Sequence, residues 1–335
     1  MIDWVSTVRI GSTDLFVPRI GLGTASLGNF LEPMTDAEAI AVIRRALEAG
    51  IRYIDTAPLY GHGLAEQRVG QAIADLPRSE LVVSTKVGRL LREGAPRDES
   101  QYHRGEPFYR DVPPAGPVWD FSENGIRSSV TESASRVGVD RFDILHLHDP
   151  DEHFTEASTT GYKALDALRS ERSVTAIGAG MNRTPVQTEL VRHCDLDAVL
   201  VAGRYTLLDQ SAMDDLLPAC VERGVSVVIG GVFNSGVLVE PAPGALFDYV
   251  PAAAAVLERA RLLQRVCRRH GVSLAAAALQ FPLAHPCVCS VLLGPRSIAE
   301  LETNLGLLEV DIPRELWRDL ITEGLLRADV PVPDS

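Results

Sequence analysis

The stretch Ile51-Arg52-Tyr53-Ile54-Asp55 is a short apolar run that ends in a carboxylate. Two later stretches repeat the arrangement, with Leu81-Val82-Val83-Ser84-Thr85 before Lys86 and Ile144-Leu145-His146-Leu147 before His148. A buried strand that ends in one ionisable residue is typical of a parallel β/α barrel, whose active site lies at the C-terminal ends of its strands. The three stretches therefore predict a barrel with its chemistry gathered at one end.

A fourth polar residue, Tyr60, lies in the loop after Asp55. The ordinary pKa of a tyrosine is about 10, and a nearby ammonium lowers it, so we expect Lys86 to lower the pKa of Tyr60. A buried ammonium needs a counter-charge, which Asp55 on the neighbouring strand can provide. His148 can hydrogen-bond a substrate oxygen and orient it. Together the four residues suffice for proton transfer at a carbonyl or an alcohol.

Helical and strand patterns alternate along most of the chain. Thr35 and Glu38 form a capping box ahead of a helix that ends at Gly50. The expected strands are Ile20 to Gly23, Ile51 to Ile54, Leu81 to Lys86, Ile144 to His148, Val174 to Ala179, Ala198 to Val201, Ser226 to Gly230 and Val288 to Leu293. Eight strands alternating with helices predict an α/β fold, a (β/α)8 TIM barrel, as a single domain over residues 1–335. The alternative, a doubly wound open sheet, fits less well because no glycine-rich dinucleotide turn follows the first strand.

Three segments lie outside the repeating strand–helix unit. Residues 8–17 read as a β-hairpin around a Gly-Ser-Thr-Asp turn, which we expect to plug the bottom of the barrel. Residues 89–120 and 233–251 are rich in glycine and proline and leave from the C-terminal ends of strands. Long loops at that end usually shape substrate pockets. The candidate pocket residues are Trp119, Phe108 and Tyr109.

Composition narrows the function classes. The chain has 335 residues, is 46% hydrophobic and 23% charged, and carries a formal net charge of -13. So acidic a protein is not expected to bind nucleic acid or an anionic membrane. Because neither a membrane-spanning apolar stretch nor a signal peptide is evident, we expect a cytoplasmic protein. The five cysteines fit no disulfide framework and no histidine–cysteine metal set, so we expect reduced thiols and no metal.

Four segments together resemble the aldo-keto reductase superfamily, and the match covers nearly the whole chain. They are Gly21-Leu22-Gly23-Thr24, Asp55 to Gly61, Ser84-Thr85-Lys86 and Asp143 to His148. The resemblance implies a β/α barrel that binds an extended NAD(P). It also implies a catalytic tetrad with Tyr60 as general acid/base, completed by Lys86, Asp55 and His148.

The resemblance also implies a set of cofactor-binding residues: Gly23, Thr24, Asn182, Gly230, Phe233, Gly294, Arg296, Glu300 and Asn304. Residues 294–297 should open a helix whose N-terminus attracts the adenosine phosphate. Many NADP-using members carry a basic residue at the position of Glu300, and a carboxylate there would repel a 2′-phosphate. Arg296 argues the other way. On balance NAD is favoured over NADP.

Further segments resemble one branch of this superfamily, which contains L-fucose dehydrogenase, D-threo-aldose 1-dehydrogenase and pyridoxal 4-dehydrogenase. They are residues 148–151, 203–208, 231–236, 279–286 and 324–329. The branch implies that a small sugar or lactol is oxidised at its anomeric carbon to a lactone by hydride transfer to NAD(P)+. The alternatives are pyridoxal oxidation, general aldehyde or ketone reduction, and a regulatory subunit that senses the cofactor without turnover.

Overall fold

Eight strands form a closed barrel in which all neighbouring strands are parallel. They are β3 (Ile20–Gly23), β4 (Tyr53–Asp55), β5 (Val82–Val87), β10 (Ile144–His148), β11 (Ala176–Met181), β12 (Ala198–Ala202), β13 (Ser226–Gly230) and β16 (Val288–Leu293). The structure is a computed structural model that describes residues 3–96, 101–103 and 105–333. The predicted (β/α)8 barrel is confirmed, and each strand pairs with the next barrel strand along the chain.

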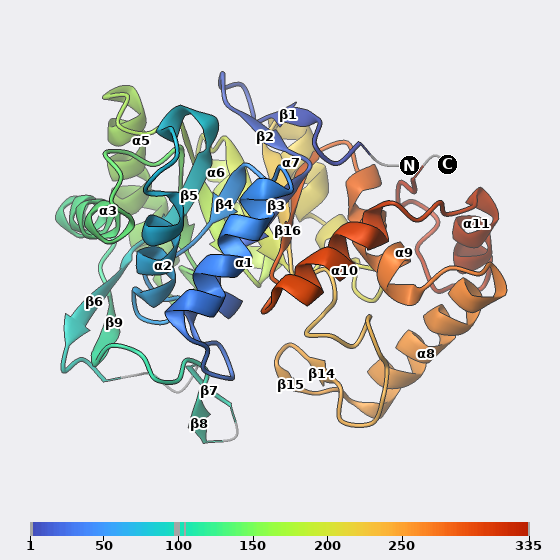
Figure 1. Cartoon of the computed structure of the whole chain (residues 1–335). Coiled ribbons are helices and arrows are strands. Elements are labelled where there is room, and N and C mark those ends of the chain that lie inside the picture. Colours follow the sequence, from blue (N-terminus) through green and yellow to red (C-terminus); the bar gives the residue numbers. More distant parts are fainter. Residues whose placement is uncertain (1–2, 97–100, 104, 334–335) are drawn as a thin grey trace.

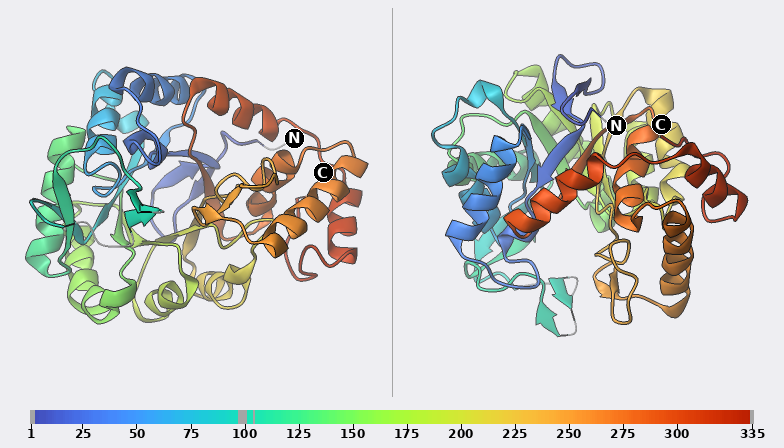
Figure 2. Two further views of the ribbon diagram at one scale, coloured as in Figure 1. Left: turned by 90° about the horizontal axis from the view of Figure 1, so that it is seen from below. Right: turned by 45° about the vertical axis from the view of Figure 1, so that its right-hand side comes forward.

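Helices surround the barrel, as Figure 2 (left) shows from the end at which the strands finish. They are α1 (Asp36–Glu48), α2 (Leu64–Ile73), α3 (Glu123–Val137), α5 (Tyr162–Ser170), α6 (Thr184–His193), α7 (Leu216–Arg223), α9 (Leu274–Gln280) and α10 (Ile298–Leu308). Two further helices, α8 (Ala254–Arg269) and α11 (Arg314–Thr322), pack on each other. The predicted capping box starts α1, because the Thr35 hydroxyl accepts from the Glu38 amide and the Glu38 carboxylate accepts from the Thr35 amide. None of the described helices is long and apolar enough to cross a membrane.

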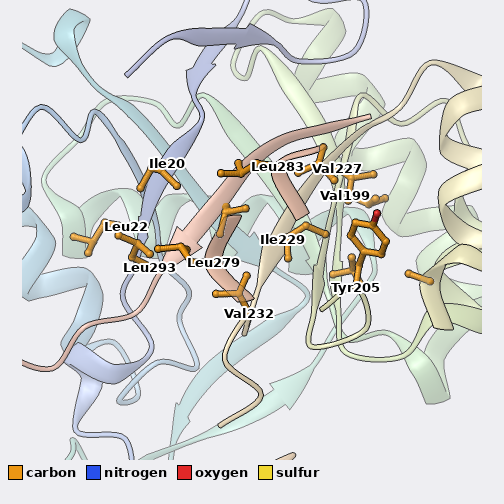
Figure 3. Close-up of a cluster of buried hydrophobic side chains, with 14 of the residues drawn as sticks. Ile20, Leu22, Val199, Tyr205, Val227, Ile229, Val232, Leu279, Leu283 and Leu293 are labelled. Atoms are coloured by element: carbon orange, nitrogen blue, oxygen red, sulfur yellow. The ribbon is translucent and has the colours of Figure 1, made fainter. Parts of the chain in front are cut away.

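The main core lies between the strands and the helices. Outward-facing side chains such as Ile20, Leu22 and Ile229 belong to one buried cluster that includes Leu279 of α9 and Leu283 of the turn after it (Figure 3). Side chains alternate along a strand, so the remaining strand residues point into the barrel. Burying both faces explains why the strands read as short apolar runs.

A second cluster fills the barrel interior at the end where the strands begin. The predicted hairpin is present as β1 (Thr7–Arg9) and β2 (Phe16–Pro18), and it inserts the buried side chains of Ile10 and Val17 among inward-facing strand residues. In Figure 1 the hairpin stands at one end of the barrel, and the hairpins of the long loops stand at the other. Because the hairpin closes this end, the opposite end, where the strands finish, is the one at which we expect the active site.

The segment 89–120 contains two antiparallel ribbons. The first pairs β6 (Arg89–Glu93) with β9 (Ala115–Trp119), and the second pairs β7 (Tyr102–His103) with β8 (Glu106–Pro107). The segment 233–251 contains the short hairpin of β14 (Leu246–Phe247) and β15 (Val250–Pro251). Both segments leave the C-terminal mouth of the barrel, as the sequence predicts.

Candidate active site

A buried ion pair lies at the mouth of the barrel, between the adjacent strands β4 and β5. The Lys86 ammonium donates to Asp55 Oδ2 at 2.6 Å and to the Thr56 carbonyl at 3.0 Å, and both charged side chains are 2% exposed. The Ser84 hydroxyl donates to the other carboxylate oxygen of Asp55 at 2.7 Å. Asp55 is therefore the counter-charge that the sequence leads us to expect.

Tyr60 is held against this pair by a turn of the main chain. Its ring centroid lies 4.7 Å from the Lys86 ammonium nitrogen. The next residue, Gly61, has φ +64°, and a Cβ built on it would lie 2.4 Å from the Gly28 carbonyl oxygen. A Cβ on Gly28 would lie 2.7 Å from the Tyr60 carbonyl carbon. The two glycines thus let the two backbone segments pack directly on each other. This contact fixes the main-chain position from which the Tyr60 side chain extends.

His148 completes the group from β10, the strand next to β5. Its ring meets the Tyr60 ring edge-on, with centroids 6.0 Å apart. Burial, helped by the Arg89 and Lys86 cations, lowers the pKa of His148 well below its usual value. The imidazole is therefore neutral near pH 7 and can hydrogen-bond a substrate oxygen without carrying charge. The four residues that the sequence singles out lie together at this end of the barrel.

The electrostatics of Tyr60 differ from the expectation. Burial raises the pKa of the Tyr60 phenol well above its usual value, the Asp55 and Asp149 carboxylates raise it further, and Arg89 lowers it. The prediction of a lowered pKa is therefore wrong for this arrangement. The physical reason is that burial disfavours the charged phenolate, and the Asp55 carboxylate that binds Lys86 adds to this effect.

The three candidate pocket residues contact different partners. Tyr109 is buried beside Tyr60, with ring centroids 6.5 Å apart. Phe108 stacks on Phe30 at 5.4 Å and meets Tyr249 edge-on at 5.8 Å. The loop after β3 and the two long segments thus share one aromatic cluster. Sequence reasoning missed Phe30 and Tyr249, because an isolated aromatic residue in a loop carries no periodic signal.

Trp119 lies under a second ion pair that the sequence analysis also missed. The Arg89 guanidinium carbon is 4.0 Å from the Trp119 ring centroid, and Arg89 Nη2 donates to Asp149 Oδ2 at 2.9 Å. Asp149 Oδ2 is in turn 3.7 Å from His148 Nε2. The available signal was position alone, because Asp149 directly follows the strand that ends in His148.

The candidate cofactor residues near the strands lie around the same mouth. Gly23 and Gly230 are the last residues of β3 and β13, Asn182 directly follows β11, and Phe233 lies three residues after β13. The Asn182 side chain is exposed, whereas the hydroxyl of the buried Thr24 donates to the Asp55 carbonyl at 3.0 Å. These candidates therefore lie at strand ends of the same barrel mouth that holds Asp55 and His148.

The remaining candidates lie at the start of α10. Ser297 caps this helix by accepting from the Glu300 amide, and the Glu300 carboxylate accepts from the Arg296 amide at 2.8 Å. The Arg296 guanidinium donates to the carbonyls of Phe30 and Glu32. Gly294 is exposed, and a Cβ built on it would meet no atom closer than 4.0 Å.

These features fit a dinucleotide. An open glycine before a capped helix N-terminus is suited to a phosphate, and the exposed Glu300 can accept ribose hydroxyls. Asn304, one turn further along α10, is half-buried. The residues at this helix would hold the adenosine end of NAD(P), with the nicotinamide end toward the tetrad.

Comparisons with known proteins agree with this geometry. Residues 19–321 match the Aldo/keto reductase family. The chain is 43% identical to D-threo-aldose 1-dehydrogenase of a Pseudomonas species, over 93% of this chain and 95% of the relative. It is 38% identical to pyridoxal 4-dehydrogenase of Microbacterium luteolum, over 95% and 97%. The holo structure of the aldo-keto reductase AKR11C1 from Bacillus halodurans superposes with a TM-score of 0.75 at 27% identity, and the match covers 97% of both chains.

The family match and the two relatives identify an oxidoreductase that works with a nicotinamide cofactor. The chain belongs to the aldo-keto reductase family. Enzymes of this family use NAD(P), so the protein is an NAD(P)-dependent oxidoreductase.

Proposed function

We propose that this enzyme oxidises a small cyclic hemiacetal, an aldose in its lactol form, at the anomeric carbon to give a lactone. The observation that carries the proposal is the close grouping of Tyr60, Lys86, Asp55 and His148 at the barrel mouth. The 43% identity to a D-threo-aldose 1-dehydrogenase supports the substrate class.

Each residue of the group has a distinct part in the proposed reaction. The neutral His148 hydrogen-bonds the lactol oxygen and orients it, and the phenolate of Tyr60 accepts the hydroxyl proton. Lys86, held in place by Asp55, stabilises the negative phenolate. NAD(P)+, when bound, would supply the acceptor for the hydride that leaves the anomeric carbon.

A second candidate substrate is pyridoxal, whose internal hemiacetal allows the same chemistry. The 38% identity to a pyridoxal 4-dehydrogenase favours it specifically. Two contrasting hypotheses remain. A general aldehyde reductase would work in the opposite direction, by reduction, and a cofactor-sensing subunit would bind the cofactor without turnover.

The substrate class is tested by comparing lactol oxidation with aldehyde reduction. We expect L-fucose or D-arabinose to be oxidised with a much higher kcat/KM than that for butanal reduction, because a site built to pair hydroxyls discriminates against analogues that lack them. Formation and consumption of NAD(P)H at the nicotinamide absorbance measure both reactions. A wide margin for butanal would instead identify a general aldehyde reductase, and cofactor binding without any turnover would favour the sensor.

We also propose that NAD is preferred over NADP. The exposed carboxylate of Glu300 lies in the first turn of α10, where it would repel a 2′-phosphate. The Arg296 guanidinium is engaged by the carbonyls of Phe30 and Glu32 and lies 3.3 Å from the Glu32 carboxylate. Arg296 is therefore less free to attract that phosphate than the sequence alone suggests.

Glu300→Arg is expected to shift the preference toward NADP, since it replaces repulsion of the 2′-phosphate with a possible bidentate contact. The readout is the ratio of kcat/KM for NAD+ and NADP+. Glu309→Arg is the matched control, because it makes the same charge change at the opposite end of α10. If the two variants gave the same ratio as the wild type, Glu300 would lie away from the ribose.

A further inference from the structure

The ion pair of Asp149 and Arg89 lies directly beside the reacting end of the site. Arg89 Nη2 donates to Asp149 Oδ2 at 2.9 Å, and the same carboxylate oxygen is 3.7 Å from His148 Nε2. The Arg89 side chain is 9% exposed, whereas that of Asp149 is 25% exposed. The carboxylate therefore remains accessible at the barrel mouth while its partner is enclosed by protein.

The backbone holds Asp149 in an uncommon conformation. Its φ is +39°, in the left-handed region that residues other than glycine seldom adopt. Its amide donates to the Gly180 carbonyl at 3.0 Å, which extends the pairing of β10 and β11 by one residue. Strained residues that neighbouring structure holds in place are concentrated at functional sites.

We propose that Asp149, oriented by Arg89, binds the hydroxyl on the carbon next to the reacting carbon, which is the 2-hydroxyl of an aldose. The inference rests on the proposed function and names the group that selects its substrate. Asp149 acts here as a specificity-determining residue, and Arg89 acts through it as a positioning residue.

The spacing of the imidazole Nε2, which donates, and the carboxylate Oδ2, which accepts, suits a vicinal pair of oxygens. Neighbouring oxygens on a sugar ring lie roughly one hydrogen-bond length apart, about 2.8 Å. With 3.7 Å between His148 Nε2 and Asp149 Oδ2, the anomeric oxygen can bond the imidazole while the 2-hydroxyl donates to the carboxylate. Hydrogen bonds to an ionised acceptor are about twice as strong as neutral ones.

The proposal separates the two candidate substrates. An aldose carries a hydroxyl on the carbon beside its anomeric carbon. In pyridoxal that neighbouring carbon belongs to the aromatic ring and carries none. Asp149 is therefore expected to favour aldoses over pyridoxal, and the wild-type protein can reveal the effect without any substitution.

The test compares D-arabinose with 2-deoxy-D-ribose, which is the same pentose without the 2-hydroxyl. We expect the wild-type kcat/KM for D-arabinose to be about 10- to 100-fold higher, as for one hydrogen bond to a charged group. In Asp149→Gly, which suits the positive φ, the ratio of kcat/KM for D-arabinose to that for 2-deoxy-D-ribose should fall to near one, whatever change the loss of the carboxylate makes to both sugars alike. Asp149→Asn, which also tolerates that φ, should give a ratio between those of the wild type and Asp149→Gly.

Asp151→Asn is the control on the same loop, where Asp151 pairs with Arg183 at 3.6 Å. This substitution should leave kcat/KM unchanged for both sugars. Equal losses on both sugars in Asp149→Gly would mean that Asp149 acts through His148, and would overturn the inference. So would a wild-type enzyme that oxidises both sugars equally well, whatever the folding of the variants. If no aldose or lactol is oxidised, the proposed function itself fails and this inference fails with it.

Discussion

Tyr60→Phe is expected to lower kcat by roughly 10²–10⁴-fold, the contribution of a positioned general acid–base group. Phenylalanine keeps the ring that lies beside the Lys86 ammonium and removes only the hydroxyl. The turn at Gly61 is set by main-chain contact with Gly28, so the position of the ring should not change. Cofactor affinity, measured by fluorescence titration, should therefore stay close to wild type.

Tyr205→Phe provides a matched control. Tyr205 is fully buried against Phe281, and its hydroxyl makes no hydrogen bond to any residue that the structure describes. Its loss should leave turnover near the wild-type value. If Tyr60→Phe retained most of its rate while Tyr205→Phe behaved as expected, the proton carrier would have to be another group.

Lys86→Met is expected to cripple turnover and to move the alkaline limb of the oxidation profile to higher pH. In the proposed reaction oxidation requires the phenolate, so its rate should rise with pH toward the pKa of Tyr60. The Asp55 carboxylate already raises that pKa. Without Lys86 no neighbouring ammonium offsets this effect of the carboxylate. The measurement is the residual kcat as a function of pH.

The double variant Asp55→Asn/Lys86→Met separates charge from simple damage. It removes both members of the buried pair, so the limb should return toward the wild-type midpoint although turnover stays low. The single variant leaves an unpaired buried carboxylate, which costs about 3–5 kcal/mol, so the double variant should also be the more stable of the two. A single variant that kept the wild-type midpoint would show that Lys86 does not tune Tyr60.

The sequence predicts the tetrad positions well because of how a barrel is wired. Successive strands are neighbours, so residues at or next to the ends of β4, β5 and β10 must meet at one edge. The hairpin plug was predictable from local pattern, because two short apolar runs around a turn must bury their side chains. Local pattern and chain order carry all of that information.

Contacts between distant loops could not be predicted in this way. Arg89 and Asp149 are 60 residues apart, and their pairing depends on the path of the segment 89–120. The meeting of Phe30 with Tyr249 depends on two loops at once. The pKa of Tyr60 was mispredicted because its largest cause is burial, which no count of nearby charges reveals. His146 lies two residues before His148 on the same strand. The local sequence pattern alone could not tell which of the two histidines belongs to the site.

The backbone contact between Gly28 and Gly61 has an evolutionary consequence. It places the main chain at Tyr60, the proposed proton carrier, by contact between two backbone segments. Mutations in those loops can then alter which molecules are accepted while the proton-transfer step stays intact. Proteins that share this arrangement can therefore change substrate specificity in small steps, because each step leaves the reacting residues in place.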